Sequence, residues 1–368
     1  MNKYFLFLSI VLILLFLSCS ESNYITIEEV PEIDFNTGSY SIQDKYNFTN
    51  KVNGQNVSIL NSIDKTGFHF YNGVKFKTED IGVLVGGTGL RARITRNGGE
   101  SWREFRFSKF ANVFHSVAFS GNTIFIIGES KYIFRSNDFG ETWNVFNSEV
   151  LFEEENSFTQ SKFYKIRFTD DEIGFIVGER SNIPIILKTI NGGKRWEIVN
   201  DNETLKNSGA ITDISVQSSK NLTIVTSLGR CYRTTDGGNN WELICKTNPL
   251  YSVAFKNRNE GYIGGVNGVL YYTDNGGKDW ISMEVPENPK ITDIVFLDNK
   301  VLITTSISSS EDRATFVYGL DENGRNIYPF ITKANKNVRF MGDAFAIDIL
   351  ENNVYILDRN NLYKTTNK

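Results

Sequence analysis

Charged side chains recur at the turns of a repeated sequence unit, and their chemistry suits the binding of a carboxylate. Several of them are arginines, whose planar guanidinium groups donate paired hydrogen bonds to carboxylate oxygens. We predict that the following residues surround a central depression and bind a ligand or partner: Arg91, Arg93, Glu129, Glu179, Arg180, Arg230, Asn267, Asp312, Arg313 and Arg359. The alternative is that these turns are charged only because they are exposed, in which case the site lies elsewhere.

Catalytic and metal-binding patterns are missing from the sequence. The two histidines, His69 and His115, do not stand at ligand spacing to a Cys, Asp or Glu, and we expect His115 to be a loop residue. No zinc motif, phosphate-binding loop or nucleophile elbow is present. The glycines of GGTGLRA (Gly86–Ala92) link two expected strands and do not open a helix, so they do not bind a dinucleotide. We therefore expect no catalytic residues, no metal and no cofactor.

An eight-residue motif marks another turn of the same repeated unit. It reads Ser/Thr-x-Asp/Asn-x-Gly-x-x-Trp, and it occurs five times and includes all five tryptophans. Asp or Asn followed by Gly is typical of tight hairpin turns, because the Asx side chain bonds to nearby backbone and Gly adopts positive φ without a steric penalty. We expect each Trp to be buried beside its turn. The Asx and Trp positions are Asn97 and Trp102, Asp138 and Trp143, Asn191 and Trp196, Asp236 and Trp241, and Asn275 and Trp280.

The motif lies within a longer unit of four short apolar strands, repeated at intervals of about 40 to 50 residues. This pattern predicts the blades of a β-propeller. Seven first strands can be identified: Val74–Phe76, Ser116–Phe119, Lys165–Phe168, Asp213–Val216, Ser252–Phe255, Asp293–Phe296 and Ala346–Ile349. Since no segment after residue 24 keeps a helical apolar period, we predict an all-β, seven-bladed propeller of four-stranded antiparallel blades.

The seventh unit lacks its fourth strand, because the sequence ends at Lys368 just after the third. A ring that does not close leaves an exposed strand edge, so we predict that an N-terminal strand completes the last blade. Our first choice is the alternating segment Asn23–Pro31, and Val57–Leu60 is a second candidate. The expected organisation is a signal peptide (1–18), a lipidated N-terminus with the closing strand (19–31), an insertion or linker (32–70) and the propeller (71–368).

The N-terminal segment predicts attachment to a membrane. Lys3 precedes the continuous apolar run Tyr4–Leu17, which is too short for a comfortable membrane span and is typical of a signal peptide. The run ends at FLSC, and polar residues follow Cys19 at once. This resembles a bacterial lipobox, which implies that Cys19 is acylated and that the protein is anchored in the periplasm or at the cell surface. Phe16 departs from the usual Leu of that motif.

The two remaining cysteines, Cys231 and Cys245, flank the fourth copy of the motif. They could face each other across a hairpin, and an extracytoplasmic location would permit a disulfide. The repeat favours a different interpretation. Positions equivalent to Cys231 hold buried residue types in the other units, whereas positions equivalent to Cys245 hold polar ones. We therefore expect the two thiols to point into different environments.

The complete unit resembles the Asp-box, or BNR, repeat of sialidases and sortilin. It is more similar to the seven-bladed propellers of the photosystem II stability and assembly factor family, in which an N-terminal strand also completes the last blade. The resemblance covers about residues 74–368, with five good repeats and two degenerate ones. It implies a non-enzymatic binding or assembly scaffold for a protein partner in the envelope, and a monomer. The Asp-boxes lie away from the ligand face in these folds, so the resemblance says more about fold than about function.

The alternative function is that of a sialidase-like glycoside hydrolase or a carbohydrate-binding propeller. Sialidases share an Arg-Ile-Pro motif near the first blade, but here Ile183–Pro184 follows Asn182 and lies in the third unit. No pair of carboxylates can be assigned to a hydrolytic mechanism by spacing. Nucleic acid is not expected as a partner, because the net charge is −4 and no basic block with interleaved aromatics is present.

The lipobox leads to a first prediction. Replacing Cys19 by Ala removes the only thiol to which the lipid could be attached at this position. We expect the variant to incorporate no labelled fatty acid, because the thiol of Cys19 is the group that is acylated. Metabolic labelling with a radioactive fatty acid measures this, and a variant that is labelled as strongly as the parent protein would show that the lipobox assignment is wrong.

Overall fold

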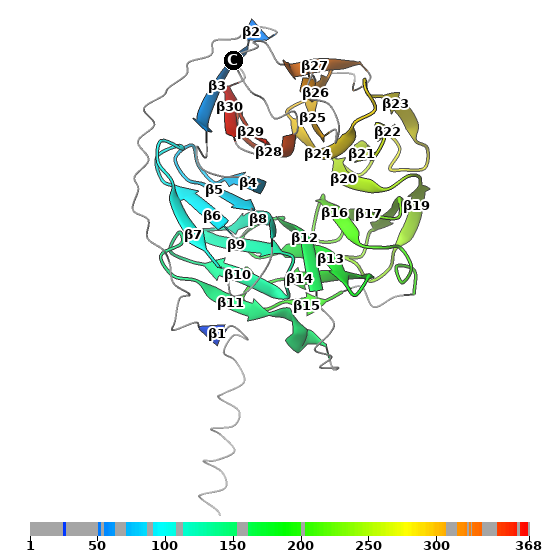
Figure 1. The fold of residues 1–368 in the computed structure, drawn as a ribbon. Helices are drawn as coiled ribbons and strands as arrows, with labels where there is room; N and C mark the ends of the chain where they lie inside the picture. Colours follow the sequence, from blue (N-terminus) through cyan, green and yellow to red (C-terminus); the bar gives the residue numbers. More distant parts are fainter. Residues whose placement is uncertain are drawn as a thin grey trace, which may run out of the picture.

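Seven β-sheets are arranged in a ring around a central axis in the computed structural model (Figure 1). The structure describes residues 25–26, 51–52, 55–62, 71–86, 91–107, 113–152, 161–199, 203–306, 315–321, 324, 326–332, 344–358 and 361–366. Neighbouring strands are antiparallel in every blade, and the one helix within these ranges is the 3-10 turn η1 (Ser148–Leu151). The prediction of an all-β, seven-bladed propeller is therefore confirmed.

Each blade runs outward from the axis in the order of the sequence. The innermost strands are β4 (Tyr71–Phe76), β8 (Phe114–Ser120), β12 (Ser161–Phe168), β16 (Ile211–Val216), β20 (Leu250–Phe255), β24 (Lys290–Leu297) and β28 (Ala344–Leu350). The second strands are β5 (Gly82–Gly86), β9 (Thr123–Gly128), β13 (Gly174–Arg180), β17 (Leu222–Thr226), β21 (Gly261–Gly265), β25 (Lys300–Ser306) and β29 (Asn353–Asp358). The second strands are the most completely buried, because neighbouring blades cover both of their faces.

The outer half of each blade begins after the turn between the second and third strands. The third strands are β6 (Arg91–Thr95), β10 (Tyr132–Ser136), β14 (Ile183–Thr189), β18 (Arg230–Thr234), β22 (Val269–Thr273), β26 (Thr315–Leu320) and β30 (Asn361–Thr366). The fourth strands are β7 (Arg103–Arg106), β11 (Asn144–Asn147), β15 (Glu197–Ile198), β19 (Glu242–Lys246), β23 (Ile281–Glu284) and β27 (Ile327–Thr332). The Asp-box forms the turn from the third strand to the fourth.

The same two hydrogen bonds hold every Asp-box. The first residue's buried hydroxyl accepts the N–H of the box Gly, at 2.7–3.1 Å in the five copies. The Asx side chain accepts the N–H four residues later, at 2.9–3.0 Å. Both bonds satisfy backbone N–H donors inside the turn. The first bond also gives the buried hydroxyl a partner, and leaving such a hydroxyl unpaired would lower the free energy of unfolding by about 1–3 kcal/mol. The box is therefore a structural element.

The Trp of each box packs at the junction between two blades. Trp143 contacts Phe105 of the preceding blade edge-on, and Trp196 contacts Phe125 in the same way. The Trp280 indole donates to the carbonyl of Ile244 in the preceding blade. Trp143, Trp196 and Trp241 are buried as predicted, whereas Trp102 and Trp280 are partly exposed.

An N-terminal strand completes the seventh blade, as predicted, but the first choice of segment is wrong. Strand β3 (Gln55–Ser62) pairs with β30 and contains the second candidate, Val57–Leu60. The short β2 (Lys51–Val52) extends this sheet. Strand β1 (Ile25–Thr26), within the segment chosen first, pairs instead with the outer strand β11 of the second blade. The range 32–70, expected to be an insertion or linker, therefore contains the closing strand.

The prediction that the two cysteine thiols point into different environments is also wrong, although they form no disulfide, in line with the preferred interpretation of the repeat. Cys231 and Cys245 are directly opposite each other on β18 and β19. Side chains that oppose each other on neighbouring antiparallel strands point to the same face of the sheet, and both thiols belong to one apolar cluster. Both are free thiols. Burial raises the pKa of each thiol, and that of Cys231 lies well above its ordinary value.

The closing strand gives a second prediction. Deleting residues 55–62 exposes the edge of β30, and we expect a melting temperature lower by roughly 10 °C or more, together with aggregation. Deleting residues 23–31 removes only the two-residue pairing of β1 and should change the melting temperature by far less. Calorimetry and size-exclusion chromatography of the two deletions measure this. Equal stability of the two proteins would contradict the role of β3.

The Asp-boxes give a third prediction, because Asp236 occupies a place that Asn fills in three other boxes. Hydrogen bonds from the Asn240 side chain and backbone lower the pKa of Asp236 to about 2. A lowered folded-state pKa contributes stability that is present above the unfolded value and lost as pH falls through the folded value. We expect the free energy of unfolding of wild type to rise relative to that of Asp236→Asn as pH increases from about 2 to 4. Above about pH 5 the difference between the two proteins should be constant. Melting curves against pH measure it, and a difference that does not depend on pH would refute it.

Candidate functional site

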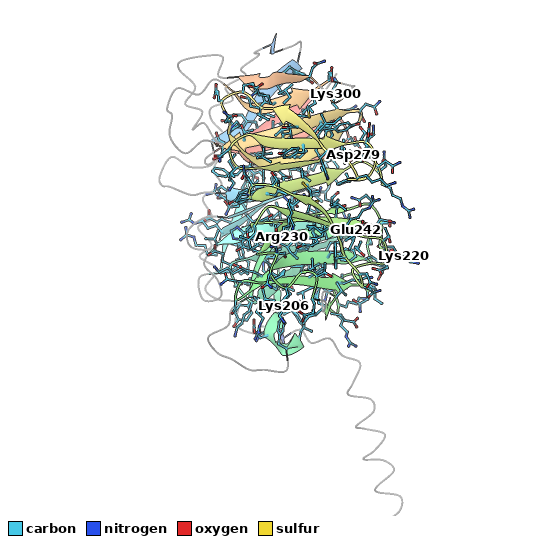
Figure 2. All side chains as sticks on the ribbon, turned by 90° about the vertical axis from the view of Figure 1, so that its right-hand side faces the viewer. Lys206, Lys220, Arg230, Glu242, Asp279 and Lys300 are labelled. Atoms are coloured by element: carbon cyan, nitrogen blue, oxygen red, sulfur yellow. The ribbon has the colours of Figure 1, made fainter. Side chains whose placement is uncertain are left out.

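The ring has two faces, and the predicted site residues that lie within the described ranges belong to one of them. One side of the ring carries the connections between blades, together with the turns between second and third strands, such as Ser181–Asn182 and Leu228–Gly229. We call this side the top face. The Asp-boxes lie on the opposite side. In the edge-on view of Figure 2, Arg230 lies toward the top face, whereas Lys220 lies at the opposite side.

One residue from each blade lines the top end of the axis. Every innermost strand has a β-bulge within its first four residues, which leaves one residue out of register with the neighbouring strand. We call these residues the axial ring: Asn72, His115, Tyr164, Thr212, Tyr251, Thr292 and Phe345. All seven are partly exposed, although the residues described before and after them are mostly buried. Bulges re-aim side chains in this way and are common beside binding sites.

On the second and third blades, the axial ring joins two of the predicted site residues. The Tyr164 hydroxyl donates to Glu179 at 2.9 Å, and the His115 ring lies 5.3 Å from the Tyr164 ring. His115 Nε2 is 3.6 Å from a Glu129 oxygen. Burial and then the Glu179 carboxylate raise the pKa of Tyr164, whereas burial lowers the pKa of His115 against the effect of Glu129. His115 was expected in a loop and is instead a bulged residue of β8.

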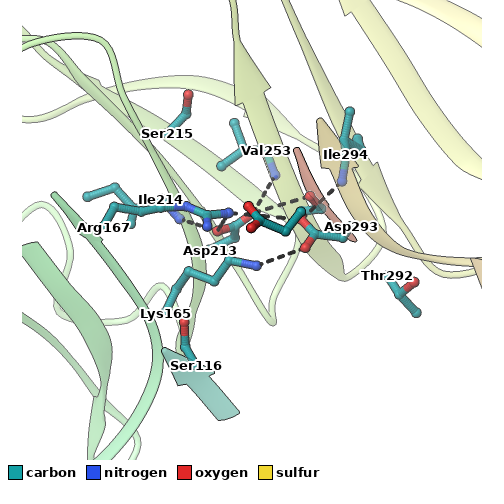
Figure 3. A network of polar contacts seen from close by, with 12 residues as sticks. Ser116, Lys165, Arg167, Asp213, Ile214, Ser215, Val253, Thr292, Asp293 and Ile294 are labelled. Carbon is teal, nitrogen blue, oxygen red and sulfur yellow. Dashed lines mark hydrogen bonds and ion pairs between the residues drawn. The ribbon is translucent and has the colours of Figure 1, made fainter. Parts of the chain in front are cut away.

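Charged side chains cross the axis below the ring (Figure 3). The Lys165 ammonium is 3.2 Å from an oxygen of Asp293, which lies three blades further on. The Arg167 guanidinium lies between Asp213 and Asp293, at 3.9 and 4.0 Å. We call these four residues the axial plug. They form a charged floor beneath the axial ring.

The carboxylates of the inner strands also link neighbouring blades. Asp213 accepts the backbone N–H of Val253 in the next blade at 3.0 Å and the Ser252 hydroxyl at 3.2 Å. Asp348 accepts the backbone N–H of Phe76 at 2.6 Å, which joins the last blade to the first. Because these aspartates already accept structural hydrogen bonds, they hold the ring together.

Three arginines of the first blade share one carboxylate. Glu104 on β7 is 3.2 Å from Arg91, 2.8 Å from Arg93 and 2.9 Å from Arg106. Burial raises the pKa of Glu104, but the arginines, Arg93 foremost, outweigh that effect and hold this pKa below its ordinary value. We call these three arginines, gathered around Glu104, the arginine cluster, and their guanidinium groups are of a kind that binds carboxylates through paired hydrogen bonds.

The other predicted residues have separate surroundings. Arg180 pairs with Glu149 at 3.1 Å and lies over the Phe152 ring. Arg230 donates to the carbonyl of Asn207. Asn267 is exposed, with φ of 55°, at its own turn. The remaining residues lie outside the described ranges: Cys19, Asp312, Arg313 and Arg359. The structure thus brings together Arg91 with Arg93, and Glu129 with Glu179 around Tyr164, but not the whole set.

The sequence-based selection omitted Arg106, Glu104 and the axial ring. Arg106 stands opposite Arg91 in the register of β6 and β7, which a hairpin alignment around the first Asp-box could have shown. The ring residues form a column just before the recognised first strands, with a bulky or polar residue in each unit. Nothing in the sequence marks this column as bulged.

Within the described ranges, no group of three or more His, Cys, Asp and Glu side chains could hold a metal ion. No helix within the same ranges is both long and apolar enough to cross a membrane.

The chain is similar to proteins of photosystem II assembly. It is 26% identical over 149 residues to the chloroplastic photosystem II stability/assembly factor HCF136 of Arabidopsis thaliana, covering 40% of this chain and 34% of that protein. It is 27% identical over 165 residues to the photosystem II assembly lipoprotein Ycf48 of Synechococcus sp. (strain CC9902), covering 44% and 46%. The chain thus matches less than half of the length of these relatives.

A solved structure shares the fold. It is described as YCF48 bound to D1 peptide, and it superposes with a TM-score of 0.62 at 17% identity, covering 82% of this chain and 94% of that one. The family model described as photosynthesis system II assembly factor YCF48 matches residues 65–151 and 147–249, which together make up half of the chain. The chain therefore belongs to the YCF48-type family of BNR-repeat propellers.

Proposed function

We propose that this protein is a non-enzymatic assembly propeller that holds a segment of a partner protein on its top face. The arginine cluster of the first blade is the observation that carries this proposal. Arg91, Arg93 and Arg106 gather around Glu104 at the top of the first blade, in a protein whose net charge is −4. The partner segment therefore carries carboxylates, which guanidinium groups bind through paired hydrogen bonds.

The family supports a protein as the ligand. The relatives that match this sequence are assembly factors by name, and one solved propeller of this fold is described as bound to a D1 peptide. Nothing in the described site favours hydrolysis. Asp213 and Asp348 accept backbone N–H groups, and Asp293 pairs with Lys165, so these inner carboxylates have structural roles. An acid and a base for glycoside hydrolysis would need such groups to face a substrate.

A lipid anchor would place the site near other envelope proteins. The lipobox at Cys19 and the similarity to a lipoprotein, the Ycf48 of Synechococcus, support anchoring in the periplasm or at the cell surface. Strand β1 pairs with the outer strand of the second blade. Ile25 follows Cys19 by six positions, a length of chain that can span at most about 20 Å. The rim of the second blade would then lie close to the membrane, and the top face would point sideways toward neighbouring proteins.

The proposal predicts that partner capture depends on the arginine cluster. Arg91→Gln with Arg106→Gln removes two of its positive charges. We expect capture of the partner from detergent-solubilised membranes of the source organism to fall about tenfold, because charged contacts at a binding face govern affinity and its salt dependence. Quantitative mass spectrometry of the captured proteins at two salt concentrations measures this.

The matched control is Arg195→Gln, which removes an exposed arginine in the third Asp-box, on the opposite face. Melting temperatures of all variants establish that they are folded. If the double variant captures the same partner with the same salt dependence as wild type, the arginine cluster is not the binding site.

A further inference from the structure

Most polar groups of the axial ring are engaged within the protein. The Asn72 amide donates to the carbonyl of Phe114, and the Thr212 hydroxyl donates to the carbonyl of Leu250 in the next blade. The Thr292 hydroxyl bonds to that of Thr304. These short side chains therefore hold neighbouring strands together, and their polar groups are not directed to a ligand.

The acidic side of the ring is engaged as well. The Tyr164 hydroxyl and the Lys162 ammonium both approach Glu179, at 2.9 and 3.9 Å. His115 approaches Glu129 at 3.6 Å. In the axial plug below, Lys165 pairs with Asp293. Glu179 and Asp293 thus each have a donor from the protein itself, which argues against a cationic ligand at these two carboxylates.

Tyr251 and Lys290 differ from the rest of the ring. The Lys290 ammonium lies 3.5 Å from the centre of the Tyr251 ring, a cation–π contact between the fifth and sixth blades. Among the described residues, Lys290 has neither a hydrogen bond nor an ion pair, and the Tyr251 hydroxyl has no hydrogen bond, although Tyr251 is near enough to Tyr164 to help raise the pKa of that residue. Burial lowers the pKa of Lys290, and no carboxylate offsets that effect.

The stacking also fixes the position of the charge. A lysine is ordinarily a flexible point charge whose ammonium remains in water. Here the Tyr251 ring covers one side of the ammonium, so its three N–H groups are left for acceptors on the other side. A half-buried cation without an acidic partner is most strongly stabilised when an anion binds beside it.

We propose that Tyr251 and Lys290 form a carboxylate subsite at the mouth of the axis, where they bind an acidic residue or the C-terminal carboxylate of the partner segment. The Lys290 ammonium donates to one carboxylate oxygen, and the Tyr251 hydroxyl donates to the same group. This inference rests on the proposed function, because it assigns a second contact to the segment held by the arginine cluster. It adds a fixed point at the axis, on the fifth and sixth blades, whereas Glu129 and Glu179 belong to the second and third.

The test uses the full-length protein and a fluorescent, N-acetylated hexaglutamate, with hexaglutamine as the neutral probe. Lys290→Met should weaken hexaglutamate binding roughly tenfold to a hundredfold, the range expected for the loss of one hydrogen bond to a charged group. Lys290→Arg should restore most of the affinity. Tyr251→Phe, which keeps the ring and removes the hydroxyl, should cause a smaller loss.

The matched control is Lys162→Met, at the same mouth, because Lys162 already has Glu179 as its partner. It should change the affinity less than twofold. Fluorescence anisotropy at low and moderate salt measures the binding constants, and melting curves confirm folding. The probe is used with a free and with an amidated C-terminus. Amidation weakens binding if the subsite binds the terminal carboxylate, and it leaves binding unchanged if the subsite binds a side-chain carboxylate.

Two outcomes separate this inference from the proposed function. If Arg91→Gln with Arg106→Gln abolishes binding while Lys290→Met has no effect, the arginine cluster binds the acidic segment and the subsite at Lys290 is refuted. If Lys290→Met weakens binding and the arginine variant does not, the subsite stands and the cluster is not the binding site. Equal effects of Lys290→Met and Lys162→Met would also refute the subsite, because general charge would then explain the loss.

Discussion

A single hydrogen bond, from the box Gly N–H to the buried hydroxyl of the box Ser or Thr, recurs in five of the seven blades. It sets the turn so that the Gly adopts positive φ and its bare Cα approaches the preceding blade. A Cβ on Gly193 would lie 2.3 Å from the Phe125 ring. The bond therefore fixes the hairpin, and the hairpin fixes how closely two blades can pack. The Trp that follows fills the same junction.

With the outer junctions held by the boxes, the inner strands are joined by polar side chains. Asp213 and Asp348 accept backbone N–H groups of the next blade, and the axial plug joins blades on opposite sides of the axis. Each inner strand also has a β-bulge near its start, above these contacts. The bulges turn seven side chains toward the top of the axis, where they meet solvent. A rigid scaffold thus carries a variable ring of side chains, an arrangement common in binding sites.

The arginine cluster and the Tyr251–Lys290 pair lie on this scaffold for different reasons. Arg91, Arg93, Glu104 and Arg106 belong to one hairpin, so local register brings them together. Tyr251 and Lys290 belong to neighbouring blades and meet only because the ring places β20 beside β24. The first group depends on secondary structure, and the second depends on closure of the whole propeller.

The sequence by itself determined the architecture, because each blade is a local unit whose turn chemistry and strand pattern repeat along the chain. Five Asp-boxes and seven apolar first strands sufficed for the number of blades, the position of the tryptophans and the predominance of strands over helices in the described residues. The closing strand was correctly expected at the N-terminus, but Asn23–Pro31 and Val57–Leu60 both alternate, and only the pairing of β3 with β30 distinguished them. Cys231 and Cys245 were misjudged for a related reason, since the register of one hairpin decides which side chains oppose each other.

The candidate site depended far more on tertiary structure. The sequence showed which turns are charged, and Arg91, Arg93, Glu129 and Glu179 do contribute to clusters. It could not show that Arg180 and Arg230 satisfy Glu149 and a backbone carbonyl, because those partners come from other segments. Nor could it show that His115, Tyr164 and Tyr251 share one ring. Each blade contributes its own residue to the axis, and the sequence shows which residue that is. The contacts between these residues form only when the ring closes, because they come from different blades.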